Sequence, residues 1–391
     1  MRVPVAERRR EQQRVKALWI PHSLSPAYAG VRLRCLIPSA ILRSQGHAVS
    51  VTMQVRAQRC DAAVVQAKWL LDAGGRDELT LRMQELLQLK RQGSRLLLDS
   101  FDNYFLNHDK DPARAALLAA YRECLPHFDA FVVSSPGLVP FLRSETGPAL
   151  PIVVVGDPLE HPGANALYES RAQRLNPRRW PLYARAAASV LRIRRDRKTH
   201  RQLIWFGNHG AKYASGGMSE LIAIRTHLES AARQVPLHLR VVSNSLERYQ
   251  QILSGARFDH SYAEWNRLSF PELLREHDLV VLPSAVTSFT AAKSNNRLLL
   301  PLSLGIPVVA DGLPDYLPWK AFFALGNWNR LAETLHDLDA VRARAASSRQ
   351  IVLDMFSPQV VAQRWWTVIE SVVGGRLVSE PAASVDQART I

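Results

Sequence analysis

Short, continuous runs of apolar and β-branched residues recur along the chain, separated by segments with helical spacing. The first six runs are Ala17 to Ile20, Ala48 to Met53, Ala62 to Val65, Arg95 to Asp99, Ala130 to Ser134 and Pro151 to Val155. Helical patterns such as 31–44 and 78–92 lie between them. Strands that are apolar at nearly every position are buried on both faces, as in parallel sheets, and the helices supply the crossovers. The pattern predicts an open parallel α/β sheet up to about residue 160.

The same alternation restarts at Gln202. Further strands are predicted at Leu203 to Phe206, Leu237 to Val242, Asp278 to Leu282 and Pro307 to Ala310. The chain has 391 residues, more than the roughly 250–300 at which a single core stops growing. We therefore predict two Rossmann-like domains, 15–160 and 201–356. A helix over 357–375 follows, either as an ordinary packing helix or crossing back over both domains, and then a disordered tail over 376–391.

Between the two domains, a basic insertion over 161–200 is too long for an ordinary connection. Residues 171–201 hold eleven of the lysines and arginines and a single acid, Asp196, in a chain whose net charge is +15. A helix is predicted from Pro181 to Arg195, and its apolar residues lie on one side. These residues are Leu182, Ala186, Val190 and Ile193. The helix either binds an anionic membrane surface or is a solvated basic face docked on the protein. No base-reading motif occurs, so no nucleic acid partner is expected.

Composition excludes several classes of protein. No apolar run reaches the ~18 residues that a membrane-spanning helix needs. The basic amino terminus is not followed by the apolar segment of a signal peptide. Three widely spaced cysteines, Cys35, Cys60 and Cys124, fit neither a disulfide framework nor a zinc site, and buried thiols are expected. We therefore expect a cytoplasmic location, with peripheral attachment at the inner face of the membrane if the basic insertion binds lipid.

Two segments of the first domain follow predicted strands and carry polar groups. The loop 23–30 ends in Gly30 and is followed by a helix start with Arg32, which suits a phosphate or a sugar hydroxyl. The strand ending at Asp99 delivers two carboxylates, Asp99 and Asp102, to the edge where ligands bind in open α/β sheets. These two are the candidate catalytic residues, able to accept a proton or a hydrogen bond from an acceptor. A structural turn at Gly30 and a capping role for the carboxylates are the alternatives.

The second domain carries a polar turn between a strand and a helix. Lys293, Ser294, Asn295, Asn296 and Arg297 lie between the strand that ends near Pro283 and the run from Gly305 to Ala310. The first N–H groups of a helix lack internal partners and the helix dipole adds positive charge there, so a cationic, amide-rich turn suits an anion. Helix capping by Ser294 or Asn295 is the alternative reading and is compatible with binding.

The order of these motifs in residues 278–319 resembles the carboxyl-terminal domain of family 4-like glycosyltransferases with the GT-B fold. The resemblance implies two Rossmann-like domains that face each other across a cleft. It also implies that Lys293 and Arg297 meet the donor phosphates, and Asn295 and Asn296 the phosphates or the ribose. A second set of residues is expected near the nucleotide, from the loops after two other strands. This set comprises Gly207, Asn208, Lys212, Asp315 and Tyr316.

The resemblance implies a metal-independent enzyme that moves a sugar from a nucleotide-sugar donor to a glycan, lipid-linked or cell-envelope acceptor, with no cofactor. Two Asp-x-Asp patterns, 109–111 and 337–339, match the metal-binding motif of GT-A enzymes, but neither follows a strand as that motif does, and no metal is expected. One departure stands out. Family members carry a ribose-binding glutamate where this chain has Leu300. A non-catalytic sugar-binding or scaffold protein, or a basic membrane-surface binder, is therefore the alternative function.

Overall fold

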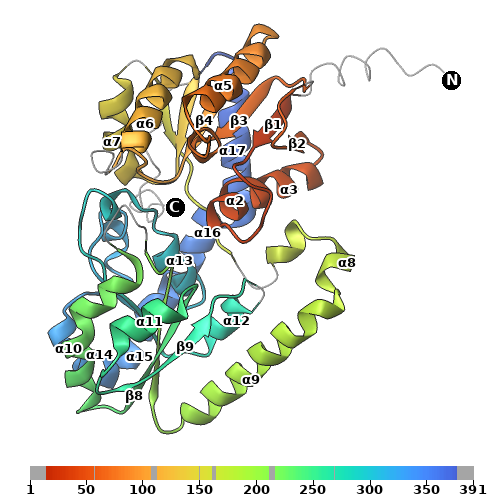
Figure 1. Cartoon of the computed structure of the whole chain (residues 1–391). Coiled ribbons are helices and arrows are strands. Elements are labelled where there is room, and N and C mark those ends of the chain that lie inside the picture. Colours follow the sequence, from red (N-terminus) through yellow and green to blue (C-terminus); the bar gives the residue numbers. More distant parts are fainter. Residues whose placement is uncertain are drawn as a thin grey trace. The chain divides into compact units, whose positions relative to one another are not determined.

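The computed structural model describes residues 15–376 except 57, 107–111, 149, 161–163, 211–215 and 268. The chain forms two compact units (Figure 1). Unit 1 comprises the residues up to Pro158 together with those from Pro358, and unit 2 comprises Leu159–Ser357. The insertion predicted over 161–200 belongs to unit 2, as far as it is described.

Unit 1 contains a parallel sheet of six strands in the order β2-β1-β3-β4-β5-β6. The order reverses between β1 and β3, because the chain first adds β2 on one side of β1 and then crosses to the other side. All six strands coincide with runs predicted from the sequence. They are β1 Lys16–Ile20, β2 Ala48–Val51, β3 Ala62–Gln66, β4 Arg95–Ser100, β5 Ala130–Val133 and β6 Ile152–Val154.

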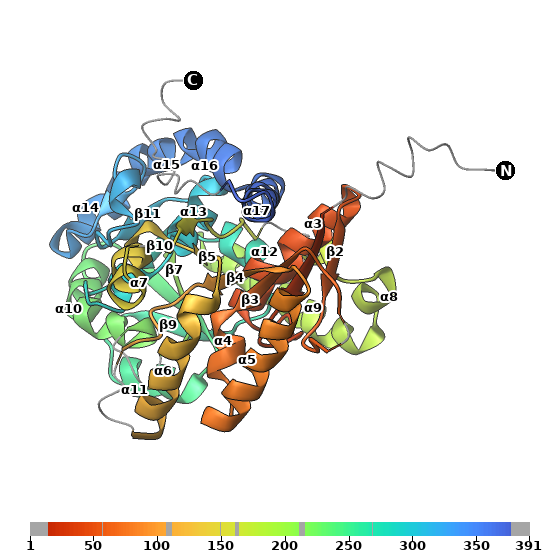
Figure 2. The ribbon, with the colours of Figure 1, turned by 90° about the horizontal axis from the view of Figure 1, so that it is seen from above.

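Helices cover both faces of this sheet. The helices α3 and α17 pack against each other on one face, and α4, α5 and α6 lie together on the other (Figure 2). A π-helical segment, Arg32–Leu36, joins α2 to α3. The final helix α17 belongs to unit 1, where its Trp365 meets Trp19 edge-on. The helices are α2 Ala29–Val31, α3 Ile37–Ser44, α4 Ala67–Leu71, α5 Arg76–Arg91, α6 Pro112–Cys124, α7 Val139–Thr146 and α17 Pro358–Val373.

Unit 2 contains a second parallel sheet of six strands, in the order β12-β11-β10-β7-β8-β9. Its order reverses between β7 and β10. Four strands follow the predicted runs, whereas β9 and β12 are edge strands that the sequence did not indicate. The strands are β7 Arg201–Phe206, β8 Leu237–Ser243, β9 Asp259–Glu264, β10 Leu279–Leu282, β11 Val308–Ala310 and β12 Ala324–Leu325.

Alternate residues of these strands enter two separate apolar clusters, one on each face of the sheet. Ile204 and Phe206 of β7 face α12, α13 and α16, whereas Leu203 and Trp205 face α10, α11 and α14. The helices are α8 Arg171–Arg174, α9 Trp180–Asp196, α10 Glu220–Ala232, α11 Leu246–Leu253, α12 Phe270–Arg275, α13 Asn296–Ser303, α14 Leu331–His336, α15 Leu338–Ser347 and α16 Arg349–Phe356. In the described part of the chain, no helix is both long enough and apolar enough to cross a bilayer.

Candidate functional site

Each unit gathers polar side chains at its own topological switch point, the place where the strand order reverses. In open α/β sheets, ligands bind beyond the carboxyl ends of the strands at this point, because the connecting loops diverge there. In unit 2 the switch lies between the ends of β7 and β10, and in unit 1 between the ends of β1 and β3.

In unit 2, Arg297 reaches from the first turn of α13 to the end of β7. Its Nη2 donates to the carbonyl oxygen of Phe206, and its guanidinium lies 5.2 Å from the ring centroid of Trp205. Gly207 leaves room for this side chain, since a Cβ atom there would lie 3.2 Å from Cζ and Nη2 of Arg297. The predicted pair Gly207 and Arg297 therefore forms one structural feature.

The Nε atom of Arg297 is buried and has no hydrogen-bond partner among the described residues. Burial lowers the pKa of the guanidinium from its ordinary value, and the nearby Tyr316 and Glu220 oppose this shift. Arginine stays protonated in proteins, so the group is charged at neutral pH. A partly buried cation with an unused, buried N–H donor stabilises an anion that can supply the missing hydrogen bond.

The remaining residues of the polar turn directly precede Arg297 in the chain. Lys293 places its ammonium 4.0 Å from the ring centroid of Phe289. Asn295 is the residue before the first turn of α13, but its side chain makes no capping hydrogen bond. Ser294 and Asn296 are partly exposed. The sequence left open that Asn295 caps the helix. Its carboxamide makes no such bond and is therefore available to a ligand.

Two carboxylates that the sequence analysis did not select also lie here. Glu220, at the start of α10, accepts a hydrogen bond from the Ala285 N–H through Oε2 (3.1 Å). Its pKa is raised by burial and by Asp311, and Arg297 opposes the rise. Asp311, directly after β11, accepts from the Ser284 N–H (2.8 Å) and from the indole of Trp328 (2.9 Å). Each follows or precedes a regular element at the sheet edge, which is the signal that could have identified them.

The other predicted residues of unit 2 have varied surroundings. Tyr316 is buried near Arg297, and Asp315 is buried next to it in the chain. Asn208 is exposed and accepts from the Gly210 N–H, which shapes the loop after β7. Lys212 lies outside the described residues.

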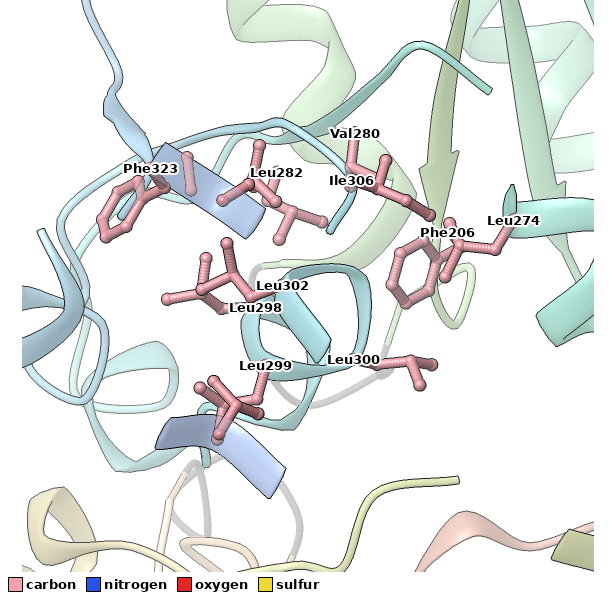
Figure 3. Close-up of a cluster of buried hydrophobic side chains, with 14 of the residues drawn as sticks. Phe206, Leu274, Val280, Leu282, Leu298, Leu299, Leu300, Leu302, Ile306 and Phe323 are labelled. Carbon is pink, nitrogen blue, oxygen red and sulfur yellow. The ribbon is translucent and has the colours of Figure 1, made fainter. Parts of the chain in front are cut away.

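The expected carboxylate position is filled by an apolar side chain. Leu300 is only 9% exposed and belongs to the apolar cluster around α13. Figure 3 shows it on the side of α13 away from Leu298 and Leu302, while Phe206 and Leu274 lie nearby on the neighbouring elements. Position 300 therefore contributes packing and offers no hydrogen bond to a ligand.

In unit 1, His22 and Gln66 meet at the switch point. Gln66 ends β3, and its Oε1 accepts from the backbone N–H of His22 (3.2 Å) while its Nε2 donates to the carbonyl of Gly30 (3.0 Å). These two bonds fix the orientation of the amide. The Nδ1 atom of His22 lies 2.8 Å from Oε1, which can only accept, so Nδ1 carries the proton.

The imidazole of His22 therefore presents an unprotonated Nε2. This atom has no hydrogen-bond partner among the described residues. Burial lowers the pKa of His22, and the bond to Gln66 only partly opposes the shift, so the ring is neutral near pH 7. A neutral imidazole with an unused acceptor suits a hydroxyl or another proton donor.

The predicted carboxylates Asp99 and Asp102 end and follow β4, as expected. Asp99 is fully buried, and its Oδ1 accepts from Nη2 of Arg34 at 2.7 Å. Burial, with a contribution from Asp157, raises its pKa to about 6. Arg34 also donates to the Val155 carbonyl and lies 3.4 Å from Asp157. The sequence located the carboxylate correctly at the strand end but gave no sign of Arg34.

The π-helical segment positions this arginine. Arg34 lies in its middle, its carbonyl accepts from the indole of Trp19 (3.2 Å), and Trp365 of α17 stacks on its guanidinium at 4.9 Å. π-helical turns often mark functional sites. Asp102 is partly exposed at the same edge.

The loop 23–30 is held by Arg32 and Phe101. Arg32 is buried, and its Nη1 donates to the carbonyls of Pro26 (2.8 Å) and Ala27 (3.1 Å). Gly30 packs under Phe101, where a Cβ would lie 2.5 Å from the ring. Both predicted residues therefore shape the loop beside His22.

Comparison with solved structures establishes the class of fold. The chain is similar to the Anabaena protein Alr3699/HepE solved with UDP and glucose, with a TM-score of 0.60 and 14% identity, over 91% of this chain and 100% of that one. It is also similar to a glycosyltransferase from Rickettsia africae (TM-score 0.58, 9% identity, 92% and 99% covered). A trehalose 6-phosphate synthase from Burkholderia multivorans matches with a TM-score of 0.50, 10% identity and coverage of 90% and 83%.

These matches run along almost the whole chain. The protein therefore has the GT-B fold with two Rossmann-like units, as the sequence predicted. No family model matches the sequence, and no curated protein matches it.

Proposed function

We propose that this protein is a glycosyltransferase that moves a sugar from a nucleotide-sugar donor to a glycan, lipid-linked or cell-envelope acceptor. The observation that carries the proposal is the partly buried guanidinium of Arg297, fixed at the switch point of unit 2 with a buried Nε donor that has no partner among the described residues. The similarity of the fold to a protein solved with UDP and glucose supports a nucleoside diphosphate as the leaving group.

In this proposal unit 2 stabilises the departing diphosphate. Arg297 donates to one phosphate oxygen, Lys293 supplies a second positive charge, and the first N–H groups of α13 add the positive end of the helix dipole. Preorganised donors aimed at developing negative charge are often the largest single contribution to catalysis. Fixed cations of this kind make the chemistry metal-independent in our proposal.

Glu220 takes the place of the missing ribose ligand. Leu300 cannot accept a hydrogen bond, whereas Oε1 of Glu220 has no hydrogen bond within the described residues, and Glu220 lies close enough to Arg297 for the two charges to interact. A carboxylate accepts hydrogen bonds from two neighbouring hydroxyls, which is what a ribose presents. We assign the ribose contact to Glu220.

Unit 1 binds the acceptor, and His22 contacts the hydroxyl that attacks the sugar. The lone pair on Nε2 can accept the proton of that hydroxyl. Asp99 was the residue first expected in this role, and its burial beside Arg34 fits a positioning role for it. Asp102 remains a candidate for a hydrogen bond to the acceptor.

A non-catalytic scaffold is the second candidate, and the burial of Leu300 is the observation that favours it. The two candidates differ in whether nucleotide binding leads to transfer. In both, we place the protein in the cytoplasm, with the basic residues 171–201 directed toward the inner face of the membrane.

The test uses the purified full chain. Thermal-shift measurements with UDP, GDP, ADP and CMP identify the nucleotide, because a ligand that binds only the folded state raises its stability. A panel of sugar derivatives of that nucleotide is then assayed for donor hydrolysis and transfer. Binding with turnover is expected. Binding without any turnover, or a folded protein that binds none of the four nucleotides, would refute the transferase and support the scaffold.

A further inference from the structure

The basic insertion of unit 2 presents a second apolar stripe that faces away from the protein. The helix α9 spans Trp180–Asp196 and is preceded by α8 and a 3₁₀ turn, Pro177–Arg179. Figure 1 shows α9 as a long helix, in yellow-green, at the side of the unit 2 sheet. We call the segment 171–198 the basic arm.

The carboxyl-terminal half of α9 docks on unit 2. Ile193 is fully buried in the cluster that contains Leu274 and Ile204. Arg194 pairs with Glu276 at 2.6 Å, and Arg197 pairs with Asp278 at 2.6 Å just beyond the helix. These contacts fix which side of α9 faces the protein.

The start of the arm is also fixed. Arg179 pairs with Glu169 at 2.9 Å, and Arg267, from the loop after β9, pairs with the same carboxylate. The arm is thus held at both ends, and its orientation on unit 2 is defined by these ion pairs rather than by its own helix alone.

The outward side of α9 carries Trp180, Ala184, Ala187 and Leu191. Their spacing of four, three and four residues places them in one row along a helix. All four are exposed, and Trp180 and Leu191 are 65% and 67% exposed. This row lies opposite Ile193, so it is not the stripe that the sequence analysis examined.

Positive charge flanks the row. Arg178, Arg185, Arg192 and Lys198 are exposed, and none of them forms an ion pair within the described residues. The only acid in the arm, Asp196, lies beside Arg195 at the docked end of the helix. Within the described part of the chain, nothing covers this exposed tryptophan and leucine, and the arginines beside them have no acidic partner.

We propose that the outward side of the basic arm binds the surface of a bilayer that contains anionic lipids. Tryptophan is favoured at the membrane interface because its ring is apolar and its indole N–H is polar. Arginines beside an apolar row are typical of helices that lie in the interface plane. A nucleic acid would use the charge and leave Trp180 and Leu191 without a role. The inference goes beyond sugar transfer, since binding to vesicles needs neither donor nor acceptor.

The experiment measures cosedimentation of the full chain with vesicles of phosphatidylcholine alone or mixed with phosphatidylglycerol. We expect binding only to the anionic vesicles, with affinity that falls as salt rises. The double variant Trp180→Ala, Leu191→Ala should bind anionic vesicles at least about tenfold more weakly than the unaltered protein. Its matched control is Ile222→Ala, Leu246→Ala, which removes two exposed apolar side chains from other helices (57% and 50% exposed) and leaves the charge unchanged.

A second pair of variants tests the charge. Arg185→Glu, Arg192→Glu should lose anionic vesicle binding by at least about tenfold, since each basic residue near such a surface contributes on the order of 1 kcal/mol. The control Arg91→Glu, Arg233→Glu changes net charge equally at exposed positions outside the arm. An equal loss of vesicle affinity in the variant and its control would overturn the proposal. Unchanged affinity for anionic vesicles in the Trp180→Ala, Leu191→Ala variant would overturn it too.

Two further measurements separate membrane binding by the arm from nucleotide binding by unit 2 and from nucleic acid binding by the arm. The stabilisation by UDP should be unchanged in all arm variants, so a loss of vesicle binding with normal UDP binding concerns the arm alone. Binding of double-stranded DNA more tightly than vesicles, unaffected by Trp180→Ala, would assign the arm to nucleic acid and refute a membrane role. Failure of the protein to bind anionic vesicles at low salt would also refute it.

Discussion

Replacing Arg297 with lysine tests the central feature of the unit 2 site. The guanidinium does two things at once: Nη2 bonds to the carbonyl of Phe206, and the unpartnered Nε is left for a ligand. Its planar fork allows both bonds from one rigid group, whereas a lysine ammonium is a single point at the end of a flexible chain. Arg297→Lys keeps the charge and loses this division of roles.

The loss of affinity follows from one charge-assisted hydrogen bond. Hydrogen bonds to charged groups contribute about 1.5–3 kcal/mol, which corresponds to roughly a 10- to 150-fold rise in the Kd for UDP. The same change removes the bond to Phe206 and part of the contact with Trp205. We expect this to lower the free energy of unfolding by about 1 kcal/mol in the absence of ligand.

The assay is calorimetric titration with UDP, combined with thermal unfolding of the free protein. Arg342→Lys is the matched control, since Arg342 is 42% exposed and pairs with Asp339 on the surface of unit 2. Arg297→Gln serves as a second variant, which also removes the charge. Unchanged UDP affinity in Arg297→Lys, in a protein that unfolds normally, would refute the role that we give to the guanidinium.

Four further predictions concern single residues. His22→Ala should lower the transfer rate on the order of 10²-fold and leave UDP binding unchanged; equal turnover in the variant would exclude a role in proton transfer. Glu220→Gln should weaken UDP about fivefold and inorganic pyrophosphate little, because only UDP has a ribose, and titration of both ligands decides this. Arg34→Met should cost about 3–5 kcal/mol in chemical denaturation, since it leaves the buried Asp99 carboxylate without its partner; a loss under 1 kcal/mol contradicts the buried ion pair. Burial lowers the pKa of His277 from 6.5 to about 3, so the unfolded state takes up a proton that the folded state does not. Stability is therefore lost as pH falls below about 6.5, by about 2 kcal/mol at pH 5, and His277→Gln should flatten this part of the denaturation profile.

The sequence predicted strands well where both faces are buried and poorly at the edges. β3 and β10 are apolar at almost every position, so their runs could be recognised without knowing their neighbours. β9 is an edge strand with the sequence Asp-His-Ser-Tyr-Ala-Glu, and it is only partly buried. β12 has two residues and exists because it pairs with β11. Edge strands of this kind depend on tertiary pairing that no local pattern reveals.

The candidate site was predictable where a residue directly follows a strand or opens a helix. Gly207 directly follows β7, Arg297 lies in the first turn of α13, and the switch between β7 and β10 brings them together. The partner of Asp99 was not predictable, because Arg34 lies 65 residues earlier in the chain and enters the core through a π-helical turn. A buried arginine in a helix of mixed composition leaves no local signature.

The helical pattern of the basic arm predicted its docked side but not its exposed apolar row. The sequence pattern predicts the apolar stripe that contains Ile193, and Ile193 is buried on the side of α9 that docks on unit 2. The opposite row with Trp180 and Leu191 is interrupted by small alanines and arginines, so its apolar character is weak on a wheel. Only the exposure of these side chains in the folded protein makes the row a candidate surface.

The position of Leu300 also explains why a carboxylate is expected elsewhere. Leu298, Leu299 and Leu302 of α13 point into the apolar cluster, and Leu300 joins the same cluster from another side of the helix (Figure 3). A glutamate at position 300 would carry its charge into that apolar surrounding, where desolvation opposes ionisation. At the start of α10, by contrast, Glu220 has a backbone N–H donor and lies near the positive Arg297. A carboxylate is therefore less costly at position 220 than at position 300, and the donor site retains one acidic group beside its cation without the usual residue.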